Sequence, residues 1–179
     1  MSLKRMDIES VAVGGGPIAS LVVLRSREAA DEPGMQLPIR IGSVEASAIS
    51  MGVSGKPGGR PMTHDLLVDA VRSLGGTIAD VRITGVEDTT FFAQLQVVDA
   101  QGDVHMLDSR PSDALALAVR CDAPIFADQD VLDVAAMPDF KAVEHQACER
   151  ELERFHEFVE NVTPDDFGAA TPRSDTDQD

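Results

Sequence analysis

Three consecutive runs of strand-forming residues, at 77–86, 90–98 and 103–108, constrain the fold more than any other part of this chain. The segments between them are short and have the Asp, Thr and Gly residues that favour turns. In the first run Val81 and Ile83 alternate with polar residues, which is typical of a strand with one face in a core. These runs therefore predict half-buried antiparallel strands.

The N-terminal part of the chain adds three more strands before the first helix. The runs at 8–13 and 19–25 flank a glycine-rich turn and predict a hairpin, and 37–41 predicts a third strand. Helices are expected at 44–53 and 64–74. Because helices follow groups of two or three strands instead of alternating with single strands, we predict an α+β fold with a mixed, largely antiparallel sheet and packed helices.

The two predicted helices carry specific expectations about their caps and buried faces. Ser43 and Thr63 precede them and are of the residue types favoured at N-caps. Helix 44–53 is small and apolar, which predicts burial on most of its sides. In helix 64–74 the apolar residues recur at helical spacing and predict the face toward the core; they are Leu66, Leu67, Ala70, Val71 and Leu74.

The negative charge of the chain, −16 in total, is unevenly distributed. Residues 1–143 carry 20 acidic and 12 basic residues, a net −8, and residues 144–179 carry 11 and 3, another −8. This balance argues against a broad basic surface for nucleic acid and against binding to anionic membranes. We expect an α+β domain over 1–140, an acidic C-terminal helical extension over 141–168 and a disordered tail over 169–179.

The cysteines and the N-terminus indicate the compartment. Cys121 and Cys148 are far apart and form neither a disulfide framework nor a metal-spaced pair. The basic start of the chain is followed by acidic residues and a glycine-rich turn instead of the apolar run of a signal peptide. No stretch approaches the ~20 apolar residues of a membrane helix. We therefore expect a cytoplasmic protein that does not bind membranes.

Four segments occur in a specific order along the chain. They are 37–42 (Leu-Pro-Ile-Arg-Ile-Gly), 61–67 (Pro-Met-Thr-His-Asp-Leu-Leu), 108–118 (Asp-Ser-Arg-Pro-Ser-Asp-Ala-Leu-Ala-Leu-Ala) and 123–126 (Ala-Pro-Ile-Phe). In this combination the sequence closely resembles the bifunctional nuclease family, over roughly residues 6 to 137. The resemblance implies an α+β domain that is often oligomeric, for which we expect a homodimer, and nuclease activity on DNA and RNA. The family commonly has a bulky aromatic residue at the position of Arg40.

The segment 108–113 leads from a predicted strand directly into the N-terminus of a helix. Backbone N–H groups at such a point, together with Arg110, Ser109 and Ser112, form a natural binding site for phosphate or another anion. The alternative is structural: either serine caps the helix, and Arg110 pairs with Asp108.

The same segment supplies carboxylates. Asp108 and Asp113, completed by Glu45, predict a site for a hard cation such as Mg²⁺ or Mn²⁺, because such ions prefer carboxylate oxygens. In a nuclease the metal activates water while Arg110 and Asp113 act in catalysis at the phosphate. The alternative is that Asp113 and Glu45 are first-turn acids that interact favourably with the helix dipole.

His64 and Asp65 form a second candidate group at the start of helix 64–74. The ordinary pKa of histidine, about 6.5, suits a general base near neutral pH, so His64 is a candidate to deprotonate water, with Asp65 beside it. The alternative is a His and an Asp in the first turn of a surface helix. No feature of the sequence brings His64 close to Asp113.

Two functions remain open from the sequence. The first is a nuclease that hydrolyses phosphodiesters of DNA or RNA with the help of Mg²⁺ or Mn²⁺ and without an organic cofactor. The second is a non-catalytic oligomeric module that binds a protein or a small anionic ligand, which the acidic charge and the lack of Trp and Tyr favour.

Overall fold

The computed structural model describes residues 2–14, 19–27, 34–55 and 59–139. The chain divides into two compact units, Met1–Asp139 and Phe140–Asp179, and the described residues all belong to the first. The acidic extension and the tail that the sequence predicts lie outside the described residues. No described helix is both long and apolar enough to cross a membrane.

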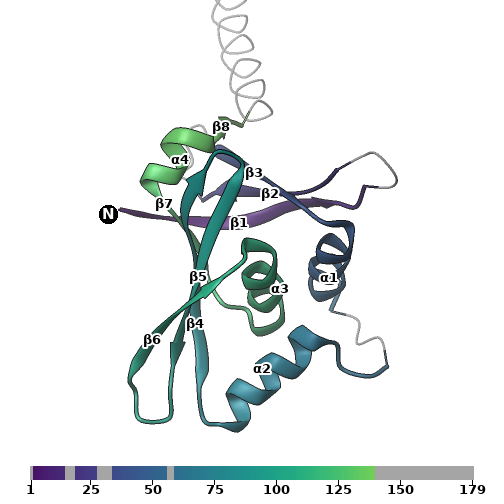
Figure 1. Ribbon diagram of the computed structural model, residues 1–179, viewed down its shortest axis with the longest axis vertical. Coiled ribbons are helices and arrows are strands. Elements are labelled where there is room, and N and C mark those ends of the chain that lie inside the picture. The colour runs from purple at the N-terminus through teal and green to yellow at the C-terminus, as the bar shows by residue number, and fades with distance from the viewer. Residues whose placement is uncertain (1, 15–18, 28–33, 56–58, 140–179) are drawn as a thin grey trace, which may run out of the picture. The chain divides into compact units, whose positions relative to one another are not determined.

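One mixed sheet organises the described unit (Figure 1). Its eight strands run in the order β6-β5-β4-β7-β1-β2-β3-β8, and β4 and β7 pair parallel while the other neighbours pair antiparallel. The α+β fold with a mixed, largely antiparallel sheet is thus confirmed. The strands are β1 Leu3–Ala12, β2 Ser20–Ser26, β3 Met35–Ile41, β4 Thr77–Glu87, β5 Thr90–Val98, β6 Val104–Ser109, β7 Ile125–Asp128 and β8 Met137–Pro138.

Four described helices complete the unit, and α3 lies at their centre. They are α1 Ser43–Val53, α2 Thr63–Ser73, α3 Pro111–Cys121 and α4 Gln129–Ala135. Residues Ala114 to Ala118 of α3 are all buried, so this helix is covered on nearly every side. Figure 1 shows α1 and α2 beside α3, and both helices contact it. The small side chains of α3 allow these neighbours to approach closely.

The closest approach of α1 to α3 occurs at Gly52. A Cβ atom at this position would overlap the side chain of Val119 and would lie 2.8 Å from Nη1 of Arg120. Glycine is therefore required at this crossing because of the space between two helices, and not because of its backbone dihedral angles.

The structure corrects two expectations about helix starts. The N-cap residues are Gly42 and Met62, so Ser43 and Thr63 are instead the first residues of α1 and α2. In α2 the side chain of Asp65 accepts a hydrogen bond from the backbone N–H of Met62 at 2.8 Å. The side chain of this acid, three residues after the N-cap, therefore bonds to the start of the helix, as the glutamate of a capping box does.

The buried faces of α1 and α2 also differ from the sequence prediction. In α2 the buried residue is Val68, while Leu66, Leu67 and Leu74 are exposed. In α1, which was expected to be buried on most sides, three apolar side chains are exposed: Val44, Met51 and Val53. Both helices pack against α3, with further contacts from α1 to β1 and β2 and from α2 to β4, and no other described element covers their outer sides.

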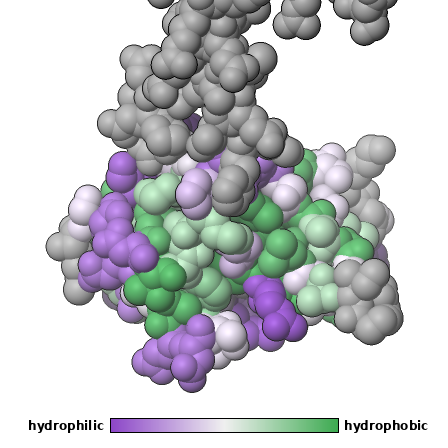
Figure 2. Space-filling model, turned by 90° about the horizontal axis from the view of Figure 1, so that it is seen from above, coloured by the Kyte–Doolittle hydropathy of each residue, from purple (hydrophilic) through white to green (hydrophobic). Residues whose placement is uncertain are grey.

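Apolar residues reach the surface elsewhere as well. Figure 2 shows them gathered across the face seen from above, with hydrophilic groups at its rim. Along the edge strand β6, every residue from Val104 to Asp108 is exposed, including Met106 and Leu107. Exposed apolar residues are common on soluble proteins, so their presence alone identifies no binding partner.

The contact at Gly52 predicts that Gly52→Ala destabilises the protein. The added methyl group overlaps Val119 and overpacks the α1–α3 crossing by about 2–3 kcal/mol, so a net loss of about 1–2 kcal/mol remains after the ~1 kcal/mol that alanine gains over glycine in a helix. We expect a melting temperature roughly 2–6 °C lower by circular dichroism. Val53→Ala, at an exposed position of the same helix, serves as the control, and a Gly52→Ala protein more stable than wild type would contradict the tight crossing.

Candidate functional site

The candidate site forms where the N-termini of α1, α2 and α3 come together. The N-cap residues of these helices are Gly42, Met62 and Arg110. Neither α1 nor α3 has a side-chain capping hydrogen bond in the described part of the chain. The free N–H groups and the positive ends of the helix dipoles therefore favour negative charge at this point.

Four polar side chains from the three helices contact one another there. The Arg110 Nε donates to Oδ2 of Asp113 at 2.8 Å, and Nη1 of Arg110 lies 3.3 Å from Oε1 of Glu45. On the other side of Asp113, Nε2 of His64 lies 3.3 Å from Oδ1. The structure thus brings together Glu45, His64, Arg110 and Asp113, which are up to 68 positions apart in the sequence (113 − 45).

The electrostatics of this cluster favour ionised carboxylates. The hydrogen bond from Arg110, more than the contact with His64, lowers the pKa of Asp113 although partial burial opposes the change. The same hydrogen bond raises the pKa of Arg110, with a smaller contribution from Glu45. With a neutral His64, the two carboxylates and one guanidinium give the cluster a net charge of −1. This negative charge favours the binding of a further cation.

His64 is held in a half-buried position. Its side chain is 18% exposed, and Nδ1 is buried without a hydrogen-bond partner among the described residues. The contact with Asp113 orients the ring through Nε2, as a carboxylate orients a catalytic histidine in many enzymes. An imidazole fixed in this way, next to an anion, is suited to accept or donate a proton.

Asp65, Ser109 and Ser112 have other surroundings. Asp65 points away from the cluster and pairs with Arg120, Nε to Oδ1, at 2.6 Å. The hydroxyl of Ser109 donates to the backbone carbonyl of Arg110 at 3.1 Å. Ser112 is buried in the first turn of α3 and lines a cavity beside the cluster.

Asp108 projects from the opposite face of the sheet. Cross-strand partners share a face, and Ser109 pairs with the buried Ala93, while Asp108 pairs with Gln94. Gln94 pairs in turn with Arg82 of β4. Because Ala93 lies in the core with α3 and neighbouring residues alternate between faces, Asp108 points away from the face on which α3 packs.

The predicted metal ligands are therefore only partly brought together. Glu45 and Asp113 contact the same guanidinium, and Asp108 does not join them. Among the described residues, no group of three or more His, Cys, Asp or Glu side chains is arranged to hold a metal ion. The metal site predicted from the sequence stays a prediction. The structure brings two of its three carboxylates together, those of Glu45 and Asp113.

A cavity of about 300 Å³ adjoins the cluster. Arg110, Glu45 and Ser112 line one side of it, and Arg40 and Phe91 belong to the other lining residues. No local sequence pattern links Arg40 and Phe91 to α3, because they come from β3 and β5, so the sequence alone does not point to them as site residues. The cavity provides space for a ligand directly beside the charged cluster.

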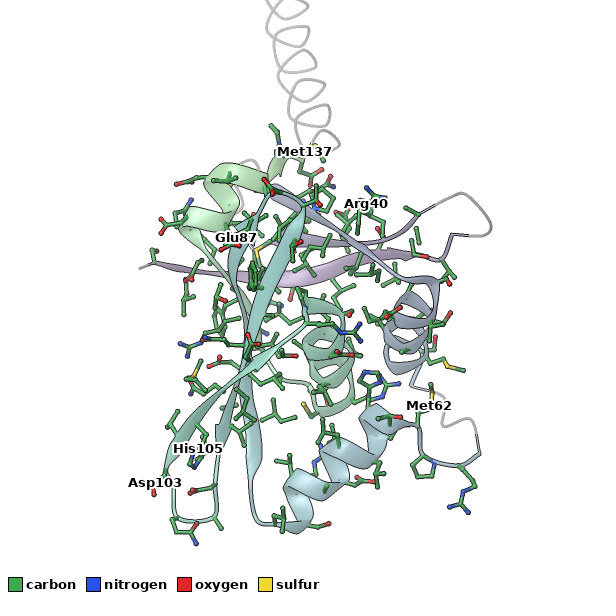
Figure 3. The ribbon with its side chains drawn as sticks, in the orientation of Figure 1. Arg40, Met62, Glu87, Asp103, His105 and Met137 are labelled. Atoms are coloured by element: carbon green, nitrogen blue, oxygen red, sulfur yellow. The ribbon has the colours of Figure 1, made fainter. Side chains whose placement is uncertain are left out.

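A further pair of a histidine and an acid, His105 and Asp99, lies far from this cluster. His105 pairs with Asp99 at 2.7 Å, and Figure 3 shows His105 and Asp103 at the distal end of the β5–β6 hairpin, well away from Met62 at the start of α2. His105 therefore does not contribute to the site.

The lowered pKa of Asp113 predicts a pH-dependent effect of Asp113→Asn. The ion pair with Arg110 contributes stability above about pH 4, the ordinary range of the carboxyl group, and loses it as the pH falls through the lowered pKa. We expect Asp113→Asn to melt roughly 1–4 °C below wild type at pH 7, and the difference to vanish near pH 2. Asp108→Asn, which breaks no hydrogen bond or ion pair with a described residue, is the control; an equal effect at both pH values would contradict the ion pair.

Comparisons with known proteins agree with the resemblance inferred from the sequence. Residues 22–139 match the model of the bifunctional nuclease domain family. An uncharacterized protein of Mycobacterium tuberculosis is 40% identical over 137 residues, which are 74% of this chain and 81% of that protein. Bifunctional nuclease 2 of Arabidopsis thaliana is 31% identical over 108 residues, 59% of this chain and 32% of the plant protein.

Bifunctional nuclease 1 of Arabidopsis thaliana is similar as well, with 30% identity over 97 residues, 53% of this chain and 30% of its own length. The similar region thus spans about a third of each plant protein. The family match covers more than half of the chain and includes all four residues of the cluster. The chain therefore belongs to the bifunctional nuclease domain family.

Proposed function

We propose that this protein is a nuclease that hydrolyses phosphodiester bonds at the cluster of Glu45, His64, Arg110 and Asp113. The observation that carries the proposal is the assembly of these four side chains at three helix N-termini, in a chain of the bifunctional nuclease domain family. Phosphodiester hydrolysis needs a cation that stabilises the phosphate and a group that activates water. In the cluster, Arg110 is the candidate for the first role and His64 for the second.

The donor set fits a divalent metal of the Mg²⁺ or Mn²⁺ type. These ions are commonly held by one or two carboxylates, with water and substrate phosphate in the remaining positions, and Glu45 and Asp113 are such a pair. Their shared contact with Arg110 indicates that a cation is stable between them. When bound, such a metal would polarise the phosphate and lower the pKa of water. No organic cofactor is part of the proposal.

The remaining steps use the side chains of the protein. The side chain of Arg110 is 67% exposed, so it is free to turn from the carboxylates toward a phosphate in the adjoining cavity. The backbone N–H of Ser112 at the start of α3, next to Ser109, would hold a further phosphate oxygen, since Pro111 has no N–H and the N–H groups of Asp113 and Ala114 donate to the carbonyl of Arg110. With Nε2–H donating to Asp113, the lone pair of His64 is on Nδ1, and His64 would accept the proton of the attacking water there once water reaches that buried atom.

The acidic character of the chain limits how the substrate binds. With a total charge of −16, tight and nonspecific attraction to a polyanion is excluded. Binding would depend on a few local contacts at Arg110 and on metal bridging between the carboxylates and phosphate. We therefore expect weak affinity for nucleic acid in the absence of metal.

The test is cleavage of DNA and RNA by the purified chain with Mg²⁺, with Mn²⁺ and with EDTA. We expect cleavage only with metal, and a loss of about 10²-fold or more in Asp113→Asn, His64→Gln and Arg110→Ala, which is the scale of a missing general base or charge-stabilising group.

Asp108→Asn is the matched control, since it removes a carboxylate of the same segment from the other face of the sheet. Wild-type rates in Asp108→Asn, with losses in the other three variants, would support the cluster. Full activity in Asp113→Asn, or activity in EDTA equal to that in Mg²⁺, would refute the proposed site.

The second candidate function is a non-catalytic oligomeric module for a protein or a small anion. It is favoured by the exposed apolar side chains of α1, α2 and β6, among them Val44, Leu74 and Val104. A homodimer measured by light scattering, together with no cleavage under any metal condition, would favour this candidate. A monomer with metal-dependent cleavage would exclude it.

A further inference from the structure

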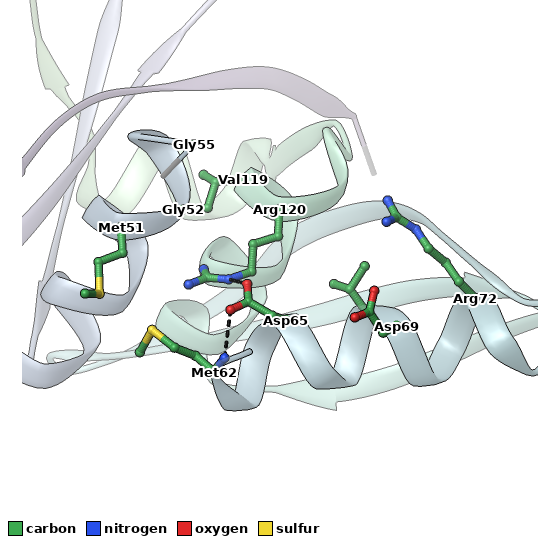
Figure 4. A pocket seen from close by; sticks show the side chains of 10 residues that line it. Met51, Gly52, Gly55, Met62, Asp65, Asp69, Arg72, Val119 and Arg120 are labelled. Carbon is green, nitrogen blue, oxygen red and sulfur yellow. Dashed lines mark hydrogen bonds and ion pairs between the residues drawn. The ribbon is translucent and has the colours of Figure 1, made fainter. Parts of the chain in front are cut away.

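Arg120 is a buried cation outside the catalytic cluster. It lies in the last turn of α3, and its side chain is only 7% exposed. Its Nε donates to Oδ1 of Asp65 at 2.6 Å, and Nη1 donates to the backbone carbonyl of Ala116 at 2.7 Å. Figure 4 shows the guanidinium facing the first turn of α2. A buried charge held by two directed hydrogen bonds fixes the geometry of both partners.

Asp65 is the residue that Arg120 holds, and both of its oxygens are used. While Oδ1 accepts from Arg120, Oδ2 accepts from the backbone N–H of Met62 at 2.8 Å (Figure 4). The Met62 hydrogen bond is the largest cause of the lowered pKa of Asp65, and Arg120 adds to it. This carboxylate therefore connects the start of α2 to the end of α3.

His64 lies between these two anchored residues. Its backbone is confined by Met62 on one side and Asp65 on the other, and its ring contacts Asp113. Asp113 and Arg120 are seven residues apart, so they lie on the same face of α3. The first turn of α2 is thus attached to α3 at two points about two turns apart.

Side-chain packing holds the middle of α2, where Val68 is buried in the core. The first turn instead borders a cavity of about 370 Å³, which adjoins the Arg120–Asp65 pair and is lined also by Met51 and Met62 (Figure 4). Beside this open space, the ion pair and the His64–Asp113 contact are the side-chain contacts that hold the orientation of the turn. Loss of the pair would allow the first turn of α2 to shift.

We propose that Arg120 is a positioning residue, which acts through Asp65 to keep the His64 ring in contact with Asp113. Asp65, which the sequence suggests as a catalytic residue, is by this assignment a positioning residue as well. The consequence for cleavage rests on the proposed nuclease function, whereas the position of the His64 ring is independent of it.

The test measures the ring signals of His64 by nuclear magnetic resonance, identified by their absence in His64→Gln. In the wild-type background, Asp113→Asn should change the chemical shifts of the ring because it removes the charge 3.3 Å from Nε2. Arg120→Met keeps most of the side-chain volume without the charge. In this variant we expect Asp113→Asn to change the His64 ring shifts by less than half as much as it does in the wild-type background. Arg120→Lys should restore part of this change.

Arg82→Met is the matched control for loss of a half-buried ion pair. Arg82 pairs with Asp80 at 2.7 Å on the other face of the sheet, and this variant should lose stability while the His64 response stays complete. If Arg120→Met does not fold, Asp65→Asn weakens the same pair with an isosteric side chain and should give the same reduced response.

In cleavage assays we expect Arg120→Met to lower kcat about tenfold with KM within about twofold, as for a misplaced catalytic group. A complete His64 response in Arg120→Met and Asp65→Asn, with lowered stability alone, would overturn the proposal. So would a wild-type His64 signal that is insensitive to Asp113→Asn. If wild-type protein cleaves nothing, the nuclease function fails, but the ring signals still decide the role of Arg120.

Discussion

The burial of α3 is the constraint on which the rest of the structure depends. A helix covered on nearly every side must be apolar around its circumference and small where neighbours cross it, and Ala114, Ala116 and Ala118 meet that condition. At Gly52 the neighbouring helix has no side chain at all, which lets α1 approach. In the first turn of α3, Pro111 and Ser112 are buried as well, but Asp113 and the N-cap residue Arg110 are partly exposed, and the starts of α1 and α2 lie beside them.

This arrangement explains why the polar groups of the site form one connected set. Arg110 neutralises part of the charge of Glu45 and Asp113, and Asp113 orients His64. A second set, formed by Arg120, Asp65 and the start of α2, meets α3 about two turns further along the same face. The central helix thus separates two roles: its first turn carries the groups suited to chemistry, and its last turn holds a neighbouring helix in place.

The acidic charge of the chain is consistent with this local design. A nuclease that depends on a wide basic groove would need clustered lysines and arginines. Here an arginine and two carboxylates share a small region beside a cavity, so recognition would depend on a cation and on a few directed contacts. The exposed apolar residues of α1, α2 and β6 arise from the same fold, because no described element packs over the outer sides of the two helices or over the edge strand β6.

The sequence by itself determined the α+β class, most strand and helix positions, the family, and the three segments that supply the cluster, because these depend on local periodicity, turn residues and an ordered set of motifs. The tertiary structure decided which residues meet. His64 and Asp113 are 49 positions apart, and no local pattern encodes their contact. The sequence pattern groups Asp108 with Asp113, but strand alternation turns Asp108 to the other face of the sheet. The sequence pattern also groups Asp65 with His64, but successive helical residues point in different directions, and a buried arginine at the far end of α3 holds Asp65.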